Sequence, residues 1–106
     1  RPDREEHEVP EQEVIHNLGR SRFELIEEGT VIGIADYVRS GDTMVFPHTV
    51  INRDRRGHGL GDVLVRAALD HVRREPGVRI VPQCWFVAAF VEEHPEYADL
   101  VAAPQE

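Results

Sequence analysis

The stretch from Val45 to Arg74 constrains the fold most, because it joins three different patterns without a break. It begins with residues that favour strands: Val45, Phe46, Val50 and Ile51. In the turn that follows, glycine alternates with other residues at Gly57, Gly59 and Gly61. Apolar residues then recur with the period of an α-helix, at Leu60, Val63, Leu64, Ala67, Ala68 and Val72. The stretch therefore predicts a strand, a glycine turn and a helix that ends at Pro76-Gly77.

The glycine turn before the helix predicts a site for an anion, best suited to a phosphate. A helix N-terminus presents unpaired backbone N–H groups at the positive end of its dipole. A P-loop needs G-x-x-x-x-G-K-[ST], and this chain contains no lysine. A dinucleotide fold needs G-x-G-x-x-G, and in a frame that starts at Gly57 the last position is Asp62. Both of these nucleotide sites are therefore disfavoured.

Composition predicts one small domain with a modest core. The chain has 106 residues, of which 41% are hydrophobic. Its 12 basic and 20 acidic residues give a net charge of −8, so nucleic acid is not expected as a partner and a cationic substrate is more compatible. The single cysteine, Cys84, excludes an internal disulfide and fits a reducing cytoplasm. We expect no membrane partner, because no apolar run reaches the length of a membrane helix and no signal-peptide pattern is present.

The order of the patterns predicts an α/β fold of the α+β kind. A flexible acidic segment at 1–13 precedes a single domain at 14–101 and a tail at 102–106. Alternating apolar residues and turn signals predict an edge strand at 14–17 and an antiparallel meander of strands at 22–27, 30–39 and 43–52. In the first meander strand, Phe23 and Leu25 should face the core and Glu24 the solvent. The crossover helix then leads to a parallel strand at 78–81, followed by a helix at 85–93 and one more helical turn at 96–101.

Four local motifs together resemble one enzyme family. Arg56-Gly57-His58-Gly59-Leu60-Gly61 fits the R/Q-x-x-G-x-G/A signature of the GNAT superfamily of acetyltransferases. Three more patterns are similar to a minimal, single-domain branch of that superfamily, over about Arg22 to Val101. They are His48-Thr49-Val50-Ile51, Pro82-x-Cys84-x-Phe86-Val87 and His94-Pro95-Glu96-Tyr97-x-Asp99-Leu100.

The resemblance implies an N-acetyltransferase that moves an acetyl group from acetyl-CoA to a primary amine. It places the pyrophosphate of CoA on a run of residues, which are Arg55, Arg56, Gly57, His58, Gly59, Leu60 and Gly61. It places the thioester carbonyl at a backbone N–H of Thr49, Val50 or Ile51, in the oxyanion-hole role. The pantetheine arm would lie between two diverging parallel strands, at 45–52 and 78–81. A small-molecule or peptide amine is expected as acceptor. Short domains of this branch lack the parts that usually build the acceptor site, so the sequence does not identify which amine it is.

Two residues are the candidates for chemistry beyond the donor. Cys84 precedes a predicted helix, whose dipole favours a thiolate. It could accept the acetyl group, return a proton to the departing CoA thiolate or bind the acceptor; the alternative is a small buried hydrophobe. His48 could take the proton of the amine; the alternative is a histidine satisfied within the core. Trp85 and Phe86 are expected in the core, His71 at the surface and His58 at the edge of the phosphate site. The spacing of histidines and Cys84 predicts no metal site.

Three functions remain open from the sequence. The first is the acetyltransferase, and the second is a module that binds CoA or acyl-CoA without turnover. The third is a structural or interaction domain, which the intact Arg56 and glycines disfavour. A cytoplasmic monomer or weak homodimer is expected in each case.

Overall fold

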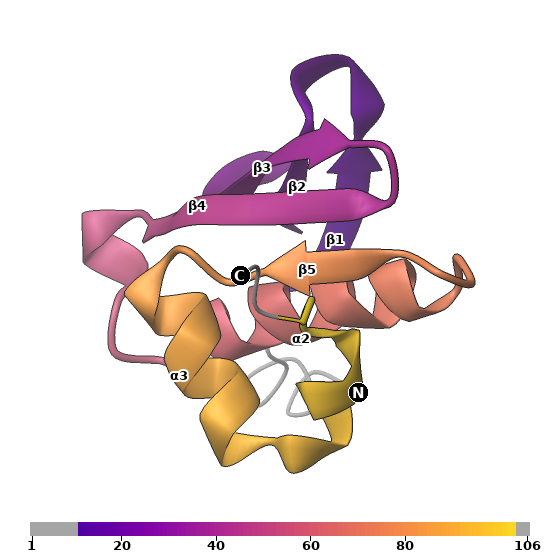
Figure 1. Cartoon of the computed structure of the whole chain (residues 1–106). Helices are drawn as coiled ribbons and strands as arrows, with labels where there is room; N and C mark the ends of the chain where they lie inside the picture. The colour runs from indigo at the N-terminus through magenta and orange to yellow at the C-terminus, as the bar shows by residue number, and fades with distance from the viewer. Residues whose placement is uncertain (1–10, 104–106) are drawn as a thin grey trace, which may run out of the picture.

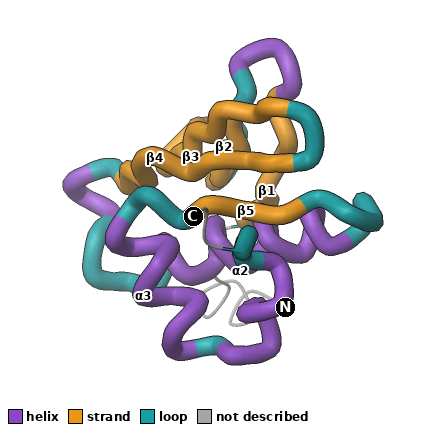
Figure 2. Tube along the Cα trace, in the orientation of Figure 1, coloured by secondary structure: helices purple, strands orange, loops and turns teal. Residues whose placement is uncertain are grey.

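A five-stranded sheet packs against two helices in the computed structural model, which describes residues 11–103 (Figure 1). In chain order the elements are β1 (Gln12–Asn17), the 3₁₀ helix η1 (Leu18–Arg20), β2 (Arg22–Glu27), β3 (Thr30–Ser40), β4 (Thr43–Ile51), the 3₁₀ helix η2 (Arg53–Arg55), α2 (Leu60–Arg73), β5 (Arg79–Val81), α3 (Trp85–Glu93) and the 3₁₀ helix η3 (Pro95–Leu100). The strands follow one another across the sheet in the order β1-β2-β3-β4-β5. Both helices lie on the same side of β1–β4 (Figure 2). The α+β fold predicted from the sequence is confirmed.

The predicted meander is present as β2, β3 and β4, which pair antiparallel. The predicted edge strand is also present, but β1 begins at Gln12. Gln12 and Glu13 therefore belong to the sheet, not to the acidic segment 1–13, because they pair with Glu27 and Ile26 of β2. Residues 1–10 of that segment lie outside the described residues.

The βαβ unit predicted around α2 is confirmed by the register of β4 and β5. These two strands run parallel, with Thr43 opposite Arg79 and Val45 opposite Val81. Past β5, the start of the predicted tail is held to the sheet: the Ala102 N–H donates to the Ile80 carbonyl at 2.8 Å. Residues 104–106 of the tail lie outside the described residues.

Helix α2 buries a face that is rotated about the helix axis from the one that the sequence pattern predicted. Leu60, Leu64, Ala68 and Val72 are buried, as expected from their spacing. Val63 was placed in the same stripe, but its side chain is 42% exposed. Val65 and Leu69 are buried instead. The helix packs against several strands at once, and its buried face is therefore turned toward the Val65 side of the predicted stripe.

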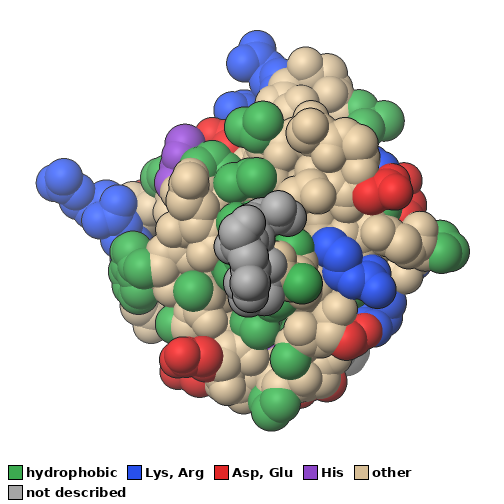
Figure 3. All heavy atoms as spheres, in the orientation of Figure 1, with side chains coloured by type: hydrophobic (Ala, Val, Ile, Leu, Met, Phe, Trp, Pro, Cys, Tyr) green, Lys and Arg blue, Asp and Glu red, His purple; other side chains and the backbone are tan. Residues whose placement is uncertain are grey.

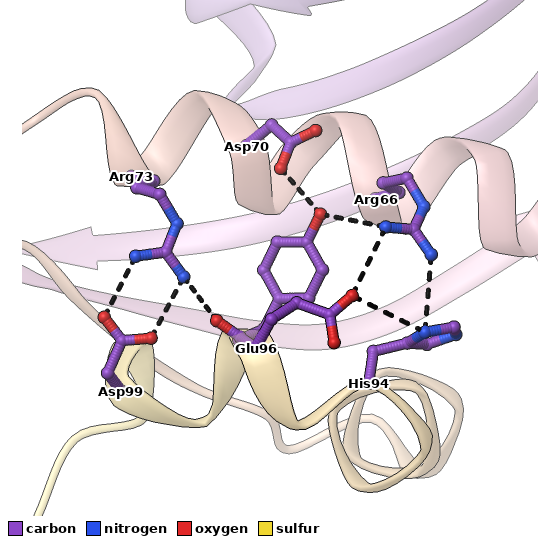
Figure 4. Close-up of polar contacts among 7 residues, drawn as sticks. Arg66, Asp70, Arg73, His94, Glu96 and Asp99 are labelled. Carbon is purple, nitrogen blue, oxygen red and sulfur yellow. Dashed lines mark hydrogen bonds and ion pairs between the residues drawn. The ribbon is translucent and has the colours of Figure 1, made fainter.

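Polar contacts fix the segment after α3 against the outer side of α2 (Figure 4). The Tyr97 hydroxyl donates to Oδ1 of Asp70 at 2.7 Å and accepts from Nη1 of Arg66 at 3.2 Å. Both terminal nitrogens of Arg73 bond the Asp99 carboxylate at 3.0 Å, and this hydrogen bonding lowers the pKa of Asp99. The His94–Leu100 motif thus supplies the contacts that join η3 to α2.

Polar side chains are also buried within the sheet, contrary to one sequence prediction. Glu24 was expected in solvent, but it is buried. Its carboxylate accepts from Nε of Arg22 at 2.9 Å and from Nδ2 of Asn17 at 3.0 Å. The hydrogen bond from Arg22 lowers the pKa of Glu24. The side chains of Arg22 and Asn17 thus bond this carboxylate on the face of the sheet that alternation assigned to solvent.

A second polar cluster lies between β1 and α2, and it includes His71, which was expected at the surface. Nε2 of His71 lies 3.1 Å from Nδ1 of His16, and Nε2 of His16 lies 2.6 Å from the Tyr37 hydroxyl. The His16 ring stacks on Phe23 at 4.3 Å between centroids. Burial, and secondarily the charge of His71, lower the pKa of His16.

Neither helix of residues 11–103 is long and apolar enough to cross a membrane.

We predict that Tyr97→Phe destabilises the protein by about 1–2 kcal/mol. The variant keeps the buried ring but leaves the Asp70 carboxylate and the Arg66 guanidinium without a hydrogen-bond partner that they now share. Chemical denaturation measures the change. Asp99→Asn is the comparison, because its ion pair with Arg73 is exposed and should matter much less. An equal loss in both variants would show that the hydroxyl has no special role.

Candidate active site

A cleft opens where β4 and β5 part. β5 ends at Val81, whereas β4 continues to Ile51. Beyond the paired ends, the Cys84 N–H still donates to the Phe46 carbonyl at 2.8 Å. One part of the cleft, the turn end, has a volume of about 570 Å³ and is lined by Thr49, Val50, Ile51, Arg55, Arg56, Gly57, Gly59, Leu60, Gly61, Asp62, Trp85 and Phe86. The adjoining part, the cysteine end, has about 370 Å³ and is lined by Pro47, His48, Thr49, Ile51, Gly61, Gln83, Cys84, Trp85 and Phe86.

The strands part at a β-bulge in β4. Asp36 of β3 lies opposite His48, and Val38 lies opposite Val45. Phe46 and Pro47 therefore both stand opposite the single residue Tyr37. A bulge of this kind bends its strand and changes which backbone groups face the neighbour. Pro47 also lacks an N–H group, so it cannot donate to a partner strand.

After the bulge, alternate backbone groups of β4 face the cleft. The Asn52 N–H donates to the Ile32 carbonyl at 2.8 Å, so this group faces β3. The Ile51 carbonyl accepts from Nε of Arg56 at 3.0 Å and faces the other way. Because successive backbone groups of a strand point to opposite sides, the N–H groups of Thr49 and Ile51 face the cleft and that of Val50 faces β3. Of the three predicted oxyanion donors, Thr49 and Ile51 have the suitable direction.

The glycine turn ends the cleft with an open helix N-terminus. Gly57 and Gly59 have φ angles of 85° and 73°, which glycine adopts without strain. A Cβ at either position would meet no atom within 4 Å, so the space beside both is open. Gly59 precedes α2 without a side-chain cap, and the first α-helical bond runs from the Val63 N–H to the Gly59 carbonyl. The N–H groups of residues 59–62 therefore lack partners within the helix.

Gly61 lines the cleft, as predicted for a binding residue, and it also has a packing role that the sequence did not predict. A Cβ at this position would lie 2.6 Å from Cζ of Phe86. Glycine is therefore needed here so that α3 can pack closely on the first turn of α2. The motif that resembles a phosphate cradle thus contains two glycines for backbone conformation and one for helix packing.

Arginine side chains lie around the turn end. In the space-filling view, basic side chains project from the edge of the molecule that carries η2 (Figure 3). Arg55 forms an ion pair with the buried Glu27, in which Nη2 lies 2.5 Å from Oε2. Arg56 anchors on the Ile51 carbonyl through Nε. His58 is exposed, and it is the one predicted binding residue that does not line the cleft.

Both predicted catalytic residues line the cysteine end. Cys84 is 7% exposed and occupies the N-cap position of α3. Its Sγ donates to Oγ1 of Thr49 at 3.8 Å. His48 projects from β4, with Nε2 2.6 Å from Oδ2 of Asp36. Asp36 was not singled out in the sequence, because its position opposite His48 depends on the register of the bulged strands.

Trp85 corrects another expectation, because it lies at the surface and not in the core. Its side chain is 78% exposed and borders both ends of the cleft. Trp85 packs edge-on against Phe86, with ring centroids 5.8 Å apart. Phe86 is half-buried, so the exposed indole forms a rim above it.

Within residues 11–103, no three His, Cys, Asp or Glu side chains are grouped to hold a metal ion.

Comparison with known families agrees with this geometry. A sequence model described as GCN5-related N-acetyl-transferase matches residues 22–100. The chain belongs to the GCN5-related N-acetyltransferase family. This family, abbreviated GNAT, consists of acyltransferases, and the resemblance stated from the sequence motifs is confirmed. No curated protein matches the chain.

Two solved GNAT structures are similar to this chain. Ribosomal-protein-alanine N-acetyltransferase from Brucella melitensis biovar Abortus 2308 is 15% identical, with a TM-score of 0.51 over 80% of this chain and 63% of that one. Ribosomal-protein-S18-alanine N-acetyltransferase from Escherichia coli is 21% identical, with a TM-score of 0.48 over 50% of this chain and 34% of that one. The match to the Brucella protein shows the GNAT fold. The chain spans less than two thirds of the length of either protein.

We predict that Gly61→Ala loosens α3 and costs about 1–3 kcal/mol of stability, a typical cost of overpacking. The new methyl group would displace the Phe86 ring from the first turn of α2. Gly19→Ala is the matched control, because its Cβ would lie 3.6 Å from the nearest atom, an ordinary contact. Combining Gly61→Ala with Phe86→Leu should restore part of the loss. Thermal unfolding of the three variants tests this, and an unchanged Tm in Gly61→Ala would refute the packing role.

Proposed function

We propose that this GNAT domain transfers the acetyl group of acetyl-CoA to a primary amine. One observation carries the proposal: the open N-terminus of α2 and the free edge of β4 face the same cleft. The first can bind phosphate through backbone N–H groups, and the second can bind amides through strand-like hydrogen bonds. CoA contains both chemical groups in one extended molecule. Family membership supports acetyl transfer as the reaction class.

The turn end suits the phosphate part of the donor. The N–H groups of residues 59–62 and the glycine turn would hold the pyrophosphate, and the open space beside Gly57 and Gly59 allows close approach. Arg56 would add positive charge there, since Nε alone is used in its bond to β4. Arg55 and Arg56 attract an anionic ligand locally, although the chain as a whole carries a net charge of −8.

The free edge of β4 suits the pantetheine and thioester part. Outward-facing backbone groups of Thr49 and Ile51 would bond the pantetheine amides and the thioester oxygen. When bound, acetyl-CoA supplies an activated acyl carbon: the amine nitrogen bonds to it, the carbon–sulfur bond breaks, and CoA leaves. Backbone N–H groups stabilise negative charge on the acyl oxygen without moving, because the sheet already fixes them.

The cysteine end would hold the acceptor and manage protons. His48 takes a proton from the incoming ammonium and passes it to solvent, to which its side chain is 55% exposed. After attack the nitrogen loses its second proton to water as the carbon–sulfur bond breaks and the amide forms. Cys84 gives its thiol proton to the departing CoA thiolate and is reprotonated from water. The amine attacks the acyl carbon directly, and this route needs no acetyl-cysteine. The hydroxyl of Thr49 fixes the cysteine side chain at the wall of the cleft.

Ligand binding gives the first test of this assignment. Acetyl-CoA and CoA should raise the Tm, because they bind the folded state, whereas ATP and NAD should raise it much less. Gly59→Val should abolish most of the shift caused by CoA, since the side chain closes the space beside the turn. Gly41→Val is the matched control: Gly41 has a φ of 60° and equally open space, but it lies in the turn between β3 and β4. Equal stabilisation by all four ligands would overturn the donor assignment.

Release of free CoA in the presence of amines gives the second test. The panel should include polyamines, lysine peptides and peptides with a free N-terminus, one of them beginning with alanine. We expect release only with a competent amine and loss of most turnover in His48→Ala. CoA binding without release on any amine would instead identify a CoA-binding module. Intact mass after incubation with acetyl-CoA alone should show no adduct; an acetyl group on Cys84 would replace direct transfer with a covalent route.

A further inference from the structure

We propose that Asp36 is a positioning residue for acetyl transfer, acting by fixing the orientation and tautomer of His48. The inference rests on the proposed function and adds a residue to it. Asp36 lies on β3 and His48 on β4, directly opposite one another in the register. Their side chains meet, with Nε2 of His48 2.6 Å from Oδ2 of Asp36.

The sheet holds the pair at the bulge. His48 is the first residue of β4 that pairs with β3 after the two-against-one irregularity. Without the bulge, the side chain at this position would point to the other face of the sheet, because the side-chain period of a strand is two. The same irregularity therefore opens the cleft and brings His48 next to Asp36.

The hydrogen bond decides which imidazole nitrogen can accept a proton. A carboxylate is an acceptor, so Nε2 of His48 must be the donor and carries the hydrogen. In the neutral ring this leaves the lone pair on Nδ1. An ammonium that enters the cysteine end gives one proton to Nδ1, and the electron pair of the broken N–H bond becomes the lone pair that attacks. The Asp36 carboxylate keeps the hydrogen bond from Nε2 and stabilises the imidazolium, which then releases a proton to water.

The other residues that line the cleft are compatible with His48 as the proton acceptor. Asp62 lines the turn end and does not line the cysteine end. The walls of the cysteine end come from Pro47, Thr49, Gln83 and Cys84, together with the two aromatic rings of α3. Among these lining residues, His48 carries the basic nitrogen. Its orientation therefore controls proton transfer from the acceptor.

Asp36→Asn tests the proposal, because an amide can donate to Nε2 and favour the wrong tautomer. We expect kcat to fall about 10- to 100-fold, at most the lower end of the roughly 100- to 10,000-fold that a general base contributes, because His48 itself remains; the KM for acetyl-CoA should be unchanged. Asp36→Glu should recover part of the rate. Asp42→Asn is the matched control, since this aspartate lies in the turn at the other end of β4. If Asp36→Asn retains the kcat of the wild type, the proposal is wrong.

A double-mutant comparison separates positioning from a general structural effect. If Asp36 acts through His48, combining Asp36→Asn with His48→Ala should lose no more activity than His48→Ala alone. Additive losses would overturn the proposal. The Tm shift caused by CoA should be the same in all of these variants, because neither side chain lies at the turn end.

A spectroscopic readout tests the pair without any turnover. Imidazole ¹⁵N chemical shifts of the wild type should show hydrogen on Nε2 of His48, and this signature should be lost in Asp36→Asn. Hydrogen on Nδ1 in the wild type would refute the positioning role. If the wild type transfers acetyl to no amine, the proposed function fails and the catalytic inference fails with it. If transfer occurs but is insensitive to Asp36, the function stands and the inference alone is rejected.

Discussion

The structure depends on one backbone irregularity, the bulge that sets Phe46 and Pro47 of β4 against Tyr37 of β3. Before it, β4 pairs with neighbours on both sides. After it, β4 pairs with β3 alone, and the backbone groups of Thr49 and Ile51 face open space. Each of these groups is a strong hydrogen-bond former, and an extended ligand can satisfy several of them at once. In the cleft, a ligand can therefore bind along β4 in the position that a neighbouring strand would otherwise occupy.

The rigid elements around the cleft give it a fixed shape. Helix α2 buries one wide face against the sheet, so its N-terminus is fixed beside the edge of β4. Phe86 packs against the backbone of Gly61 and joins α3 to that same turn. On the other side of α2, the contacts of Tyr97 and the Arg73–Asp99 pair hold η3 (Figure 4). A site built from such elements can position a reacting group without first paying the entropy of ordering a loop.

Charge is distributed unevenly, and this distribution matters more than the net value. The chain as a whole is acidic, yet the end of η2 and the residue after it place Arg55 and Arg56 in the part of the cleft that contains the open helix N-terminus. The buried Glu27 binds Arg55, and Arg56 uses only Nε in its bond to β4, so the terminal nitrogens of Arg56 remain for a ligand. At the cysteine end of the cleft, His48 pairs with the carboxylate of Asp36, so an acidic and a basic side chain lie there in place of the arginines. The two ends therefore suit an anionic donor and an amine acceptor, respectively.

The sequence by itself determined the elements, their order and the glycine turn. These follow from local properties: the period of apolar residues, the conformational freedom of Gly57 and Gly59, and the need for a crossover between parallel strands. The motifs also identified the family, because residues that share a turn or one strand are close in sequence. Tertiary structure decided which groups meet across strands and helices. The Asp36–His48 contact depends on the register of β3 and β4, and the burial of Glu24 depends on contacts around β2. The packing of Gly61 on Phe86 and the exposure of Trp85 depend on how α3 docks. A sequence pattern reports neither the register between strands nor the docking of a helix. A one-residue bulge, for example, reverses the side to which every later group of the strand points.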